Sequence, residues 1–193
     1  MPTGPALTFP PELLLAARGP GEGIAGAIFD VDGVLTDGRV YIGEHGETFK
    51  AFSTLDGHGL KLLGEGGIVP IVVTGRDSGA VRRRVKELGI VHAAYGASDK
   101  LAAAAALLAA IGIDWERVAA IGDDWPDLPI LRRAAFACAP PGAHVEVRAA
   151  VHHVTAAAAG EGAAREFCDL LLVAAGRYAG LLRGPQLALD VPR

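Results

Sequence analysis

Several side chains that could do chemistry stand where an apolar run of the sequence stops, or at the start of a helix-like run. These residues are Asp30, Asp32, Thr74, Lys100, Asp123 and Asp124. Short apolar runs that end in turn-forming residues are typical of buried strands. In open α/β sheets, ligands bind at the carboxyl edge of the strands. We therefore expect these side chains to converge on one edge of a sheet.

The chemistry of this set follows from its charges. An acid pair in a turn is commonly a helix cap or an Asx-turn, so each pair taken alone has an ordinary structural explanation. Several carboxylates on neighbouring loops, however, repel one another unless a cation lies among them. Oxygen ligands without His or Cys favour Mg²⁺ over zinc. A hydroxyl and a lysine opposite such a cation can hold a phosphate group, and this combination indicates phosphoryl transfer.

The elements that must position these residues alternate along the chain. Apolar runs predict strands over residues 24–29, 68–73, 90–94, 118–121, 136–138 and 151–154. Helices are predicted between them, with glycine stops after several and a closing helix over residues 162–182. Ser98 is the predicted cap of a helix over residues 98–111. This alternation predicts an α/β fold with a doubly wound parallel sheet.

One segment breaks the alternation. Residues 39–42 and 48–52 read as two strands around the turn 43–46, so a small β-hairpin insertion is expected over about residues 39–52. Such an insertion is too small to serve as a cap domain. The predicted organisation is an N-terminal tail over residues 1–23, one domain over 24–182 and a C-terminal tail over 183–193.

Composition narrows the class of protein. The chain has 193 residues, 51% of them hydrophobic, which suits one packed domain. A net charge of −4 offers no basic surface for nucleic acid. The longest apolar run, residues 101–111, is shorter than the ~20 residues of a membrane-spanning helix. Because no signal-peptide core is present, we expect a cytoplasmic protein without a membrane partner, whose two cysteines are reduced.

The order of these motifs resembles that of the haloacid dehalogenase-like (HAD) phosphatases, which have a Rossmann-like core. The matching strings are Asp30-Val31-Asp32-Gly33, Val72-Val73-Thr74-Gly75-Arg76, Lys100 and Ile121-Gly122-Asp123-Asp124. Further strings resemble a branch without a cap domain, the 3-deoxy-D-manno-octulosonate 8-phosphate phosphatases. They include Lys50-Ala51-Phe52, Asp56-Gly57-His58-Gly59-Leu60-Lys61 and Gly160-Glu161-Gly162-Ala163-Ala164-Arg165-Glu166. The resemblance covers about residues 24–175.

This resemblance implies a role for each catalytic residue. Asp30 would be the nucleophile that attacks phosphorus and forms an aspartyl-phosphate. Asp32 would protonate the leaving sugar oxygen and later activate water. Thr74 and Lys100 would hold the transferring phosphoryl group.

The resemblance also implies the ligands. Mg²⁺ would be held by Asp30, Asp123 and the main-chain carbonyl of Asp32, with Asp124 and Asp127 as supporting acids nearby. The implied substrate is a phosphorylated acidic sugar, first of all 3-deoxy-D-manno-octulosonate 8-phosphate, in lipopolysaccharide biosynthesis. Cations suit a substrate that carries both a carboxylate and a phosphate. The implied substrate contacts are Asp32, Ser53, Thr54, Leu55, Asp56, Gly57, Lys61, Arg76, Arg84 and Lys100.

The hairpin resembles the element through which proteins of this branch assemble as homotetramers, in which a neighbour's C-terminal tail can cover the active site. Val40, Ile42, Phe49 and Phe52 alternate as strands covered by partners would, although a hairpin lying on its own core shows the same pattern.

Some positions depart from the branch and leave alternatives open. Leu55 stands where many relatives have Arg, and Lys61 replaces a frequent Arg, so bidentate binding of a carboxylate is reduced. A phosphatase for acylneuraminate 9-phosphate is the nearest alternative. A receiver-type signalling domain is disfavoured because its phospho-accepting Asp lies on a later strand than its acid pair. A non-catalytic regulatory or oligomerisation module is the third alternative.

Overall fold

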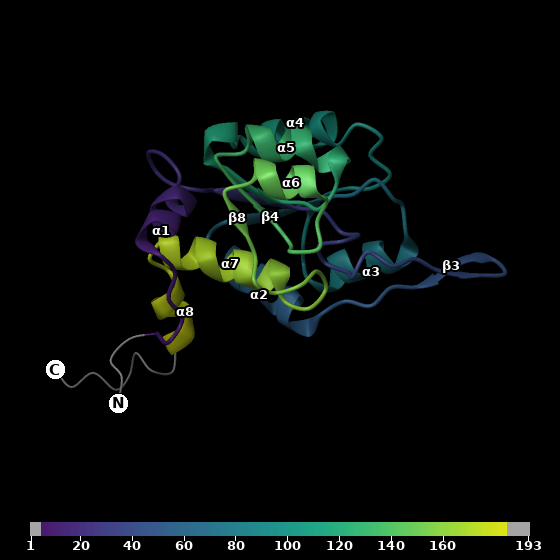
Figure 1. The fold of residues 1–193 in the computed structure, drawn as a ribbon, viewed down its shortest axis with the longest axis horizontal. Coiled ribbons are helices and arrows are strands. Elements are labelled where there is room, and N and C mark those ends of the chain that lie inside the picture. The colour runs from purple at the N-terminus through teal and green to yellow at the C-terminus, as the bar shows by residue number, and fades with distance from the viewer. Residues whose placement is uncertain (1–4, 185–193) are drawn as a thin grey trace.

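A six-stranded parallel sheet forms the centre of the protein, in a computed structural model that describes residues 5–184 (Figure 1). Its strands are β1 (Gly26–Phe29), β4 (Val69–Val73), β5 (His92–Ala94), β6 (Val118–Ile121), β7 (Phe136–Ala139) and β8 (His153–Val154). They are ordered β5-β4-β1-β6-β7-β8, and every neighbouring pair is parallel. The predicted doubly wound parallel sheet is therefore confirmed.

Helices cover both faces of this sheet. They are α1 (Pro11–Arg18), α2 (Thr54–Glu65), α3 (Gly79–Glu87), α4 (Lys100–Ile111), α5 (Leu128–Arg133), α6 (Val145–Ala150), α7 (Ala163–Ala174) and α8 (Tyr178–Arg183). Helices α4, α5 and α6 lie together on one side, and α2, α3 and α7 lie on the other (Figure 1). Among the helices of residues 5–184, none is long and apolar enough to cross a membrane.

The apolar core is divided by the sheet, because successive side chains of a strand point to opposite faces. In β1, Phe29 packs in the cluster under α2 and α7, while its neighbour Ile28 packs in the cluster under α4 and α5. Phe29 meets the ring of Phe167 from α7 edge-on, with ring centroids 5.4 Å apart. Since β1 is buried on both faces, the loop that follows it is held on a rigid support.

The predicted hairpin insertion is present between β1 and α2. Its strands β2 (Tyr41–Gly43) and β3 (Gly46–Phe49) form a separate two-stranded antiparallel sheet that projects away from the body of the molecule (Figure 1). The strands are shorter than predicted. Within residues 5–184 the segment between β1 and α2 holds no cap domain.

The structure corrects two details of the predicted helices. The helix that was expected to be capped by Ser98 begins one residue later than that cap requires, and Asp99 caps it by accepting a hydrogen bond from the main-chain N–H of Ala102. The single closing helix predicted over residues 162–182 is two helices, α7 and α8. Gly176 separates them with a φ of 69°, a left-handed conformation that ends a helix.

The segment predicted as an N-terminal tail contains a helix that packs on the domain. Helix α1 lies in the segment predicted as an N-terminal tail, and it packs against α7 with Ala17 buried in the core. Residues 1–4, and residues 185–193 of the predicted C-terminal tail, lie outside the described part of the chain. Cys138 and Cys168 are both buried and free, as expected of reduced core thiols.

Candidate active site

A cleft of about 470 Å³ opens at the carboxyl ends of β1, β4 and β6. The strands stop where the polar residues begin, so parallel strands deliver these residues to the same edge. The lining residues are Asp30, Asp32, Gly38, Thr74, Gly75, Arg76, Ala97, Ser98, Lys100, Asp123, Asp124, Pro126 and Asp127. The structure therefore brings together the predicted nucleophile, acid, phosphate contacts and metal ligands.

Lys100 lies between two buried acids at the floor of the cleft. Its Nζ is 2.6 Å from Oδ1 of Asp30 and 2.7 Å from Oδ1 of Asp127. Asp99 caps helix α4 and Lys100 is the first residue of that helix, so the lysine extends from the first turn toward β1. A buried lysine with two carboxylate partners is held in one place and keeps its charge.

Asp127 organises the loop after β6. Its Oδ2 accepts hydrogen bonds from the main-chain N–H groups of Asp123, at 3.1 Å, and Asp124, at 3.3 Å. Asp124 and Asp127 also form a capping box around the short 3₁₀ turn Trp125–Asp127. Asp127 thus supports both the main chain that carries Asp123 and the ammonium group of Lys100.

The carboxyl groups of the cleft are electrostatically strained. Burial raises the pKa of Asp30 well above its ordinary value, the charge of Asp127 raises it further, and Lys100 opposes both. Burial, followed by the charge of Asp127, raises the pKa of Asp123 to about 6. Burial lowers the pKa of Lys100, but the charges of Asp30 and Asp127 outweigh burial and the pKa is raised. An added positive charge beside these acids would relieve their repulsion.

The acids also have the geometry of a site for a hard cation. Asp30, Asp123 and Asp127 each offer a carboxylate oxygen, and these atoms lie within 4.8 Å of one another. One ion with oxygen ligands at about 2.1 Å reaches oxygens about 4.2 Å apart, which suits this spacing. Gly33 makes the arrangement possible, since it has a φ of 92° and a Cβ there would lie 2.0 Å from Oδ2 of Asp123.

Comparison with known proteins agrees with this geometry. A family model described as haloacid dehalogenase-like hydrolase matches residues 94–167. The 3-deoxy-D-manno-octulosonate 8-phosphate phosphatase KdsC of Salmonella typhi is 42% identical over 156 residues, which cover 81% of this chain and 83% of the relative. KdsC of Yersinia pestis is 41% identical over 153 residues, 79% of this chain and 82% of the relative. The chain belongs to the 3-deoxy-D-manno-octulosonate 8-phosphate phosphatase family.

Solved structures of this phosphatase family superpose closely on the chain. The enzyme from Moraxella catarrhalis, in complex with magnesium ion, phosphate ion and a KDO molecule, has a TM-score of 0.82 at 40% identity, covering 89% of this chain and 96% of its own. The cobalt-bound enzyme from Haemophilus influenzae has a TM-score of 0.82 at 38% identity, covering 88% and 98%. The chain is accordingly a phosphoric monoester hydrolase with a HAD-type fold, and the receiver-type and non-catalytic alternatives are set aside.

The motif after β4 contributes a hydroxyl and a cation to the cleft of this phosphatase. Thr74 is 1% exposed, and its Oγ1 accepts a hydrogen bond from the main-chain N–H of Arg76 at 3.3 Å. The side chain of Arg76 is 49% exposed, with Nε 3.7 Å from Oδ2 of Asp32. Thr74 is therefore fixed beside the acids, whereas the guanidinium of Arg76 is partly free to meet a ligand.

The other predicted sugar contacts do not line the cleft. These residues are Ser53, Thr54, Leu55, Asp56, Gly57, Lys61 and Arg84. Ser53 caps α2 by accepting hydrogen bonds from the main-chain N–H groups of Leu55 and Asp56. Asp56 is buried, and its carboxylate accepts hydrogen bonds from the main-chain N–H groups of Gly162 and Arg165 at the start of α7. Arg84 donates a hydrogen bond to the carbonyl of Ser53. Leu55 and Lys61 are exposed.

Three polar residues with no predicted role lie next to the acid loop, which is the loop after β1 that carries Asp30 and Asp32. Lys50 donates a hydrogen bond to Oδ1 of Asp32 at 2.5 Å and forms an ion pair with Glu47, and Glu47 accepts a hydrogen bond from the hydroxyl of Ser78. Lys50 was visible in the sequence as part of a family-like string, yet no pattern assigned it a partner. Glu47 and Ser78 carried no sequence signal, because they meet across 31 positions of the chain.

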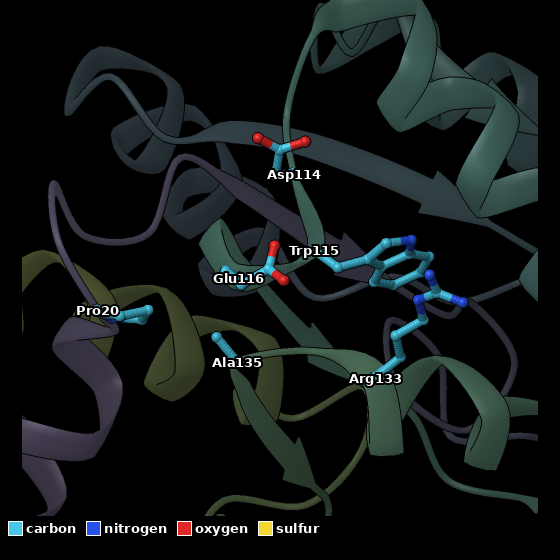
Figure 2. Close-up of a pocket in the computed structure, with 6 residues that line it drawn as sticks. All are labelled: Pro20, Asp114, Trp115, Glu116, Arg133 and Ala135. Atoms are coloured by element: carbon cyan, nitrogen blue, oxygen red, sulfur yellow. The ribbon is translucent and has the colours of Figure 1, made fainter.

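A separate hollow of about 570 Å³ lies where β6 and β7 begin, at the opposite edge of the sheet from the cleft. Figure 2 shows the guanidinium of Arg133 beside the indole of Trp115, and the distance from the guanidinium carbon to the ring centroid is 5.3 Å. Asp114 and Glu116 line the same hollow. Because Arg133 already stacks on Trp115, we assign this hollow no part in the chemistry.

Proposed function

We propose that this protein is a Mg²⁺-dependent phosphatase that hydrolyses 3-deoxy-D-manno-octulosonate 8-phosphate to the free sugar acid and phosphate. The observation that carries the proposal is the acid group of Asp30, Asp123 and Asp127 with Lys100 beside it, in a cleft at the strand ends. The relative from Moraxella catarrhalis binds magnesium, phosphate and KDO. A role in lipopolysaccharide biosynthesis follows from that substrate.

In the proposed mechanism, Asp30 attacks phosphorus and forms an aspartyl-phosphate. A bound Mg²⁺ supplies charge neutralisation for the phosphoryl oxygens and for the acids around it. It would be held by Asp30, Asp123 and the main-chain carbonyl of Asp32, with Asp127 and Asp124 as supporting acids. Lys100 and Thr74 hold the phosphoryl oxygens, and they are already fixed by Asp30 and by the main chain at Arg76.

Asp32 carries the proton in this mechanism. It protonates the sugar oxygen as the P–O bond breaks, and the resulting carboxylate then takes a proton from the water that attacks the aspartyl-phosphate. Its position two residues after the nucleophile puts it on the same loop and in the same cleft. The half-exposed Arg76 supplies the cation for the carboxylate of the sugar acid.

The direct test is phosphate release by the purified protein from 3-deoxy-D-manno-octulosonate 8-phosphate, with Mg²⁺ and with a chelator. Release should require Mg²⁺, and Asp30→Asn should reduce kcat by about 10³-fold or more, since it removes the nucleophile. Asp114→Asn, at an exposed acid, is the matched control and should keep wild-type activity.

The same assay decides between substrates. We expect kcat/KM for the eight-carbon phosphate to exceed that for acylneuraminate 9-phosphate by about tenfold or more, a difference of about 1.4 kcal/mol. A preference for the nine-carbon acid would replace the proposed substrate. Wild-type protein that releases phosphate from neither sugar acid would contradict the proposed function.

We further propose that the protein is a homotetramer assembled through the hairpin. Large apolar side chains are exposed on and next to the hairpin, namely Val40, Ile42, Phe49 and Leu55. Tyr41 and Phe49 stack with ring centroids 4.5 Å apart, which places an aromatic pair on the two-stranded sheet. Such a surface on a projecting element is typical of a contact with other subunits.

A further inference from the structure

Four charged side chains form a closed ring beside the cleft. Nζ of Lys50 lies 2.5 Å from Oδ1 of Asp32 and 3.3 Å from Oε2 of Glu47. Nη2 of Arg76 lies 3.3 Å from the same oxygen of Glu47, and its Nε lies 3.7 Å from Oδ2 of Asp32. The ring contains two acids and two cations. Lys50 therefore contacts Asp32 without adding a net positive charge to the ring.

Lys50 is the most deeply buried member of this ring. Its side chain is 0% exposed, although it follows the projecting strand β3 directly. A buried ammonium group is costly unless its partners are fixed, so it adopts one position rather than many. A surface lysine would leave Asp32 free to rotate. This lysine restrains it, in the way that outer residues orient the groups that react.

Glu47 fixes the other side of Lys50. Its carboxylate accepts a hydrogen bond from the hydroxyl of Ser78, which lies directly before α3. That hydrogen bond is the main reason why the pKa of Glu47 is lowered, so the residue stays ionised. Polar side chains of the hairpin therefore contact both the loop after β1 and the loop after β4.

The two oxygens of Asp32 are unequal as a result. Oδ1 is bound to Lys50, whereas Oδ2 is buried without a hydrogen-bond partner among the described residues. Arg76, whose Nε lies 3.7 Å from Oδ2, is half exposed and can turn toward a ligand. Oδ2 is therefore the oxygen left with a free lone pair for exchanging a proton with a substrate.

We propose that Lys50, held by Glu47, is a positioning residue that aims Oδ2 of Asp32 at the leaving oxygen of the substrate. The inference rests on the proposed function, in which Asp32 is the acid. In the step concerned, the bond between phosphorus and the sugar oxygen breaks, and the proton on Oδ2 moves to that oxygen. The alcohol leaves neutral and Asp32 remains as a carboxylate.

The test uses two substrates that differ in their need for that proton. The alkoxide of a sugar is a poor leaving group and requires protonation, whereas p-nitrophenolate leaves without it. The quantity to compare is kcat/KM, which reports steps up to departure of the leaving group. Lys50→Met should lower kcat/KM for 3-deoxy-D-manno-octulosonate 8-phosphate by about 10²-fold, and for p-nitrophenyl phosphate by less than about 5-fold.

Matched variants separate this role from a general loss of structure. Lys86→Met removes an exposed lysine of α3 and should leave both substrates unaffected. Lys50→Arg keeps a donor toward Asp32 and should restore part of the activity on the sugar phosphate. Glu47→Gln keeps Lys50 but weakens the contact that holds it, so it should lower kcat/KM selectively for the sugar phosphate, by a smaller factor than Lys50→Met. This variant tests the proposal if Lys50→Met does not fold.

Asp32→Asn distinguishes failure of the inference from failure of the proposed function. If Asp32→Asn is selective for the sugar phosphate and the Lys50 and Glu47 variants lower both substrates equally, the positioning role is overturned and the acid role of Asp32 stands. If Asp32→Asn is itself not selective, the acid role fails and the positioning role fails with it. Adding Lys50→Met to Asp32→Asn should lower kcat/KM for the sugar phosphate by less than about a further 3-fold, because the two substitutions remove the same interaction.

Discussion

At the scale of single residues, the cleft combines acids that repel one another with one lysine that is already paired. Asp30, Asp123 and Asp127 lie within reach of a single ion, and Lys100 neutralises only part of their charge. The elevated pKa values of Asp30 and Asp123 have burial as their main cause. Both the charge and the oxygen donors therefore favour a divalent cation, and protons compete with that cation for the same groups.

This competition predicts how Mg²⁺ binding depends on pH. Asp123 has its pKa raised from 3.8 to about 6 in the folded protein, so it is mainly protonated at pH 5 and ionised at pH 7. Mg²⁺ affinity, measured by calorimetry, should be at least about tenfold weaker at pH 5 than at pH 7. Asp114→Asn should keep this dependence, and equal affinity at both pH values would contradict it.

The raised pKa of Asp123 also determines how the stability of the metal-free protein changes with pH. A carboxyl group with a raised pKa contributes stability that is full below pH 3.8 and is lost as pH rises through about 6. Mg²⁺ offsets the repulsion that appears above this range. The increase in melting temperature on adding Mg²⁺ should therefore be larger at pH 7 than at pH 5.

At the scale of elements, α2 and α7 are joined by a cap that connects distant parts of the chain. Asp56, in the first turn of α2, accepts hydrogen bonds from the main-chain N–H groups of Gly162, at 3.3 Å, and Arg165, at 2.8 Å. Such N–H groups at a helix start otherwise lack partners. The contact orients the loop before α7, in which Gly160 packs against the main chain of Thr36 after the acid loop.

This contact predicts that Asp56 acts mainly on stability. Asp56→Ala should lower the free energy of unfolding by about 2 kcal/mol, measured by urea denaturation, because it leaves buried N–H groups unpaired. Glu65→Ala, at an exposed acid near the end of the same helix, is the control and should change stability by less than about 0.5 kcal/mol. Unchanged stability together with a raised KM would instead assign Asp56 to the substrate.

At the scale of the whole molecule, the hairpin has two different sides. On one side, Lys50 contacts Asp32 and Glu47 contacts Arg76 beside the cleft, while on the outer side Ile42 and Phe49 are 69% and 56% exposed. The projecting sheet does not pair with the central one. Contacts between subunits would therefore be made by the same element that holds the acid loop.

The proposed assembly predicts a change of mass in solution. Wild-type protein should sediment as a tetramer, and Ile42→Glu together with Phe49→Glu should shift it toward monomers, because charges would be buried at the contact. Val91→Glu, at a side chain that is 81% exposed on another surface, should leave the tetramer intact. A wild-type protein that sediments as a monomer would contradict the proposal.

The sequence by itself determined the alternation of strands and helices and the positions of the polar strand ends. Asp30, Thr74 and Asp123 follow apolar runs that are typical of buried strands, and parallel strands bring their ends to one edge. Helix ends were less well predicted. Ser98 and Asp99 are both good caps in adjacent positions, and a glycine in left-handed conformation at Gly176 divides a continuous apolar pattern.

Only the tertiary structure decided which side chains contact the predicted catalytic residues. Lys50 reaches Asp32 across 18 positions, Glu47 reaches Ser78 across 31, and Asp56 reaches Gly162 across 106. No local pattern records such contacts, because they depend on how the hairpin and α7 pack onto the sheet. The spacing of residues along the chain placed the acids at the edge, and packing determined which oxygen of Asp32 is bound by Lys50 and which has no hydrogen-bond partner among the described residues.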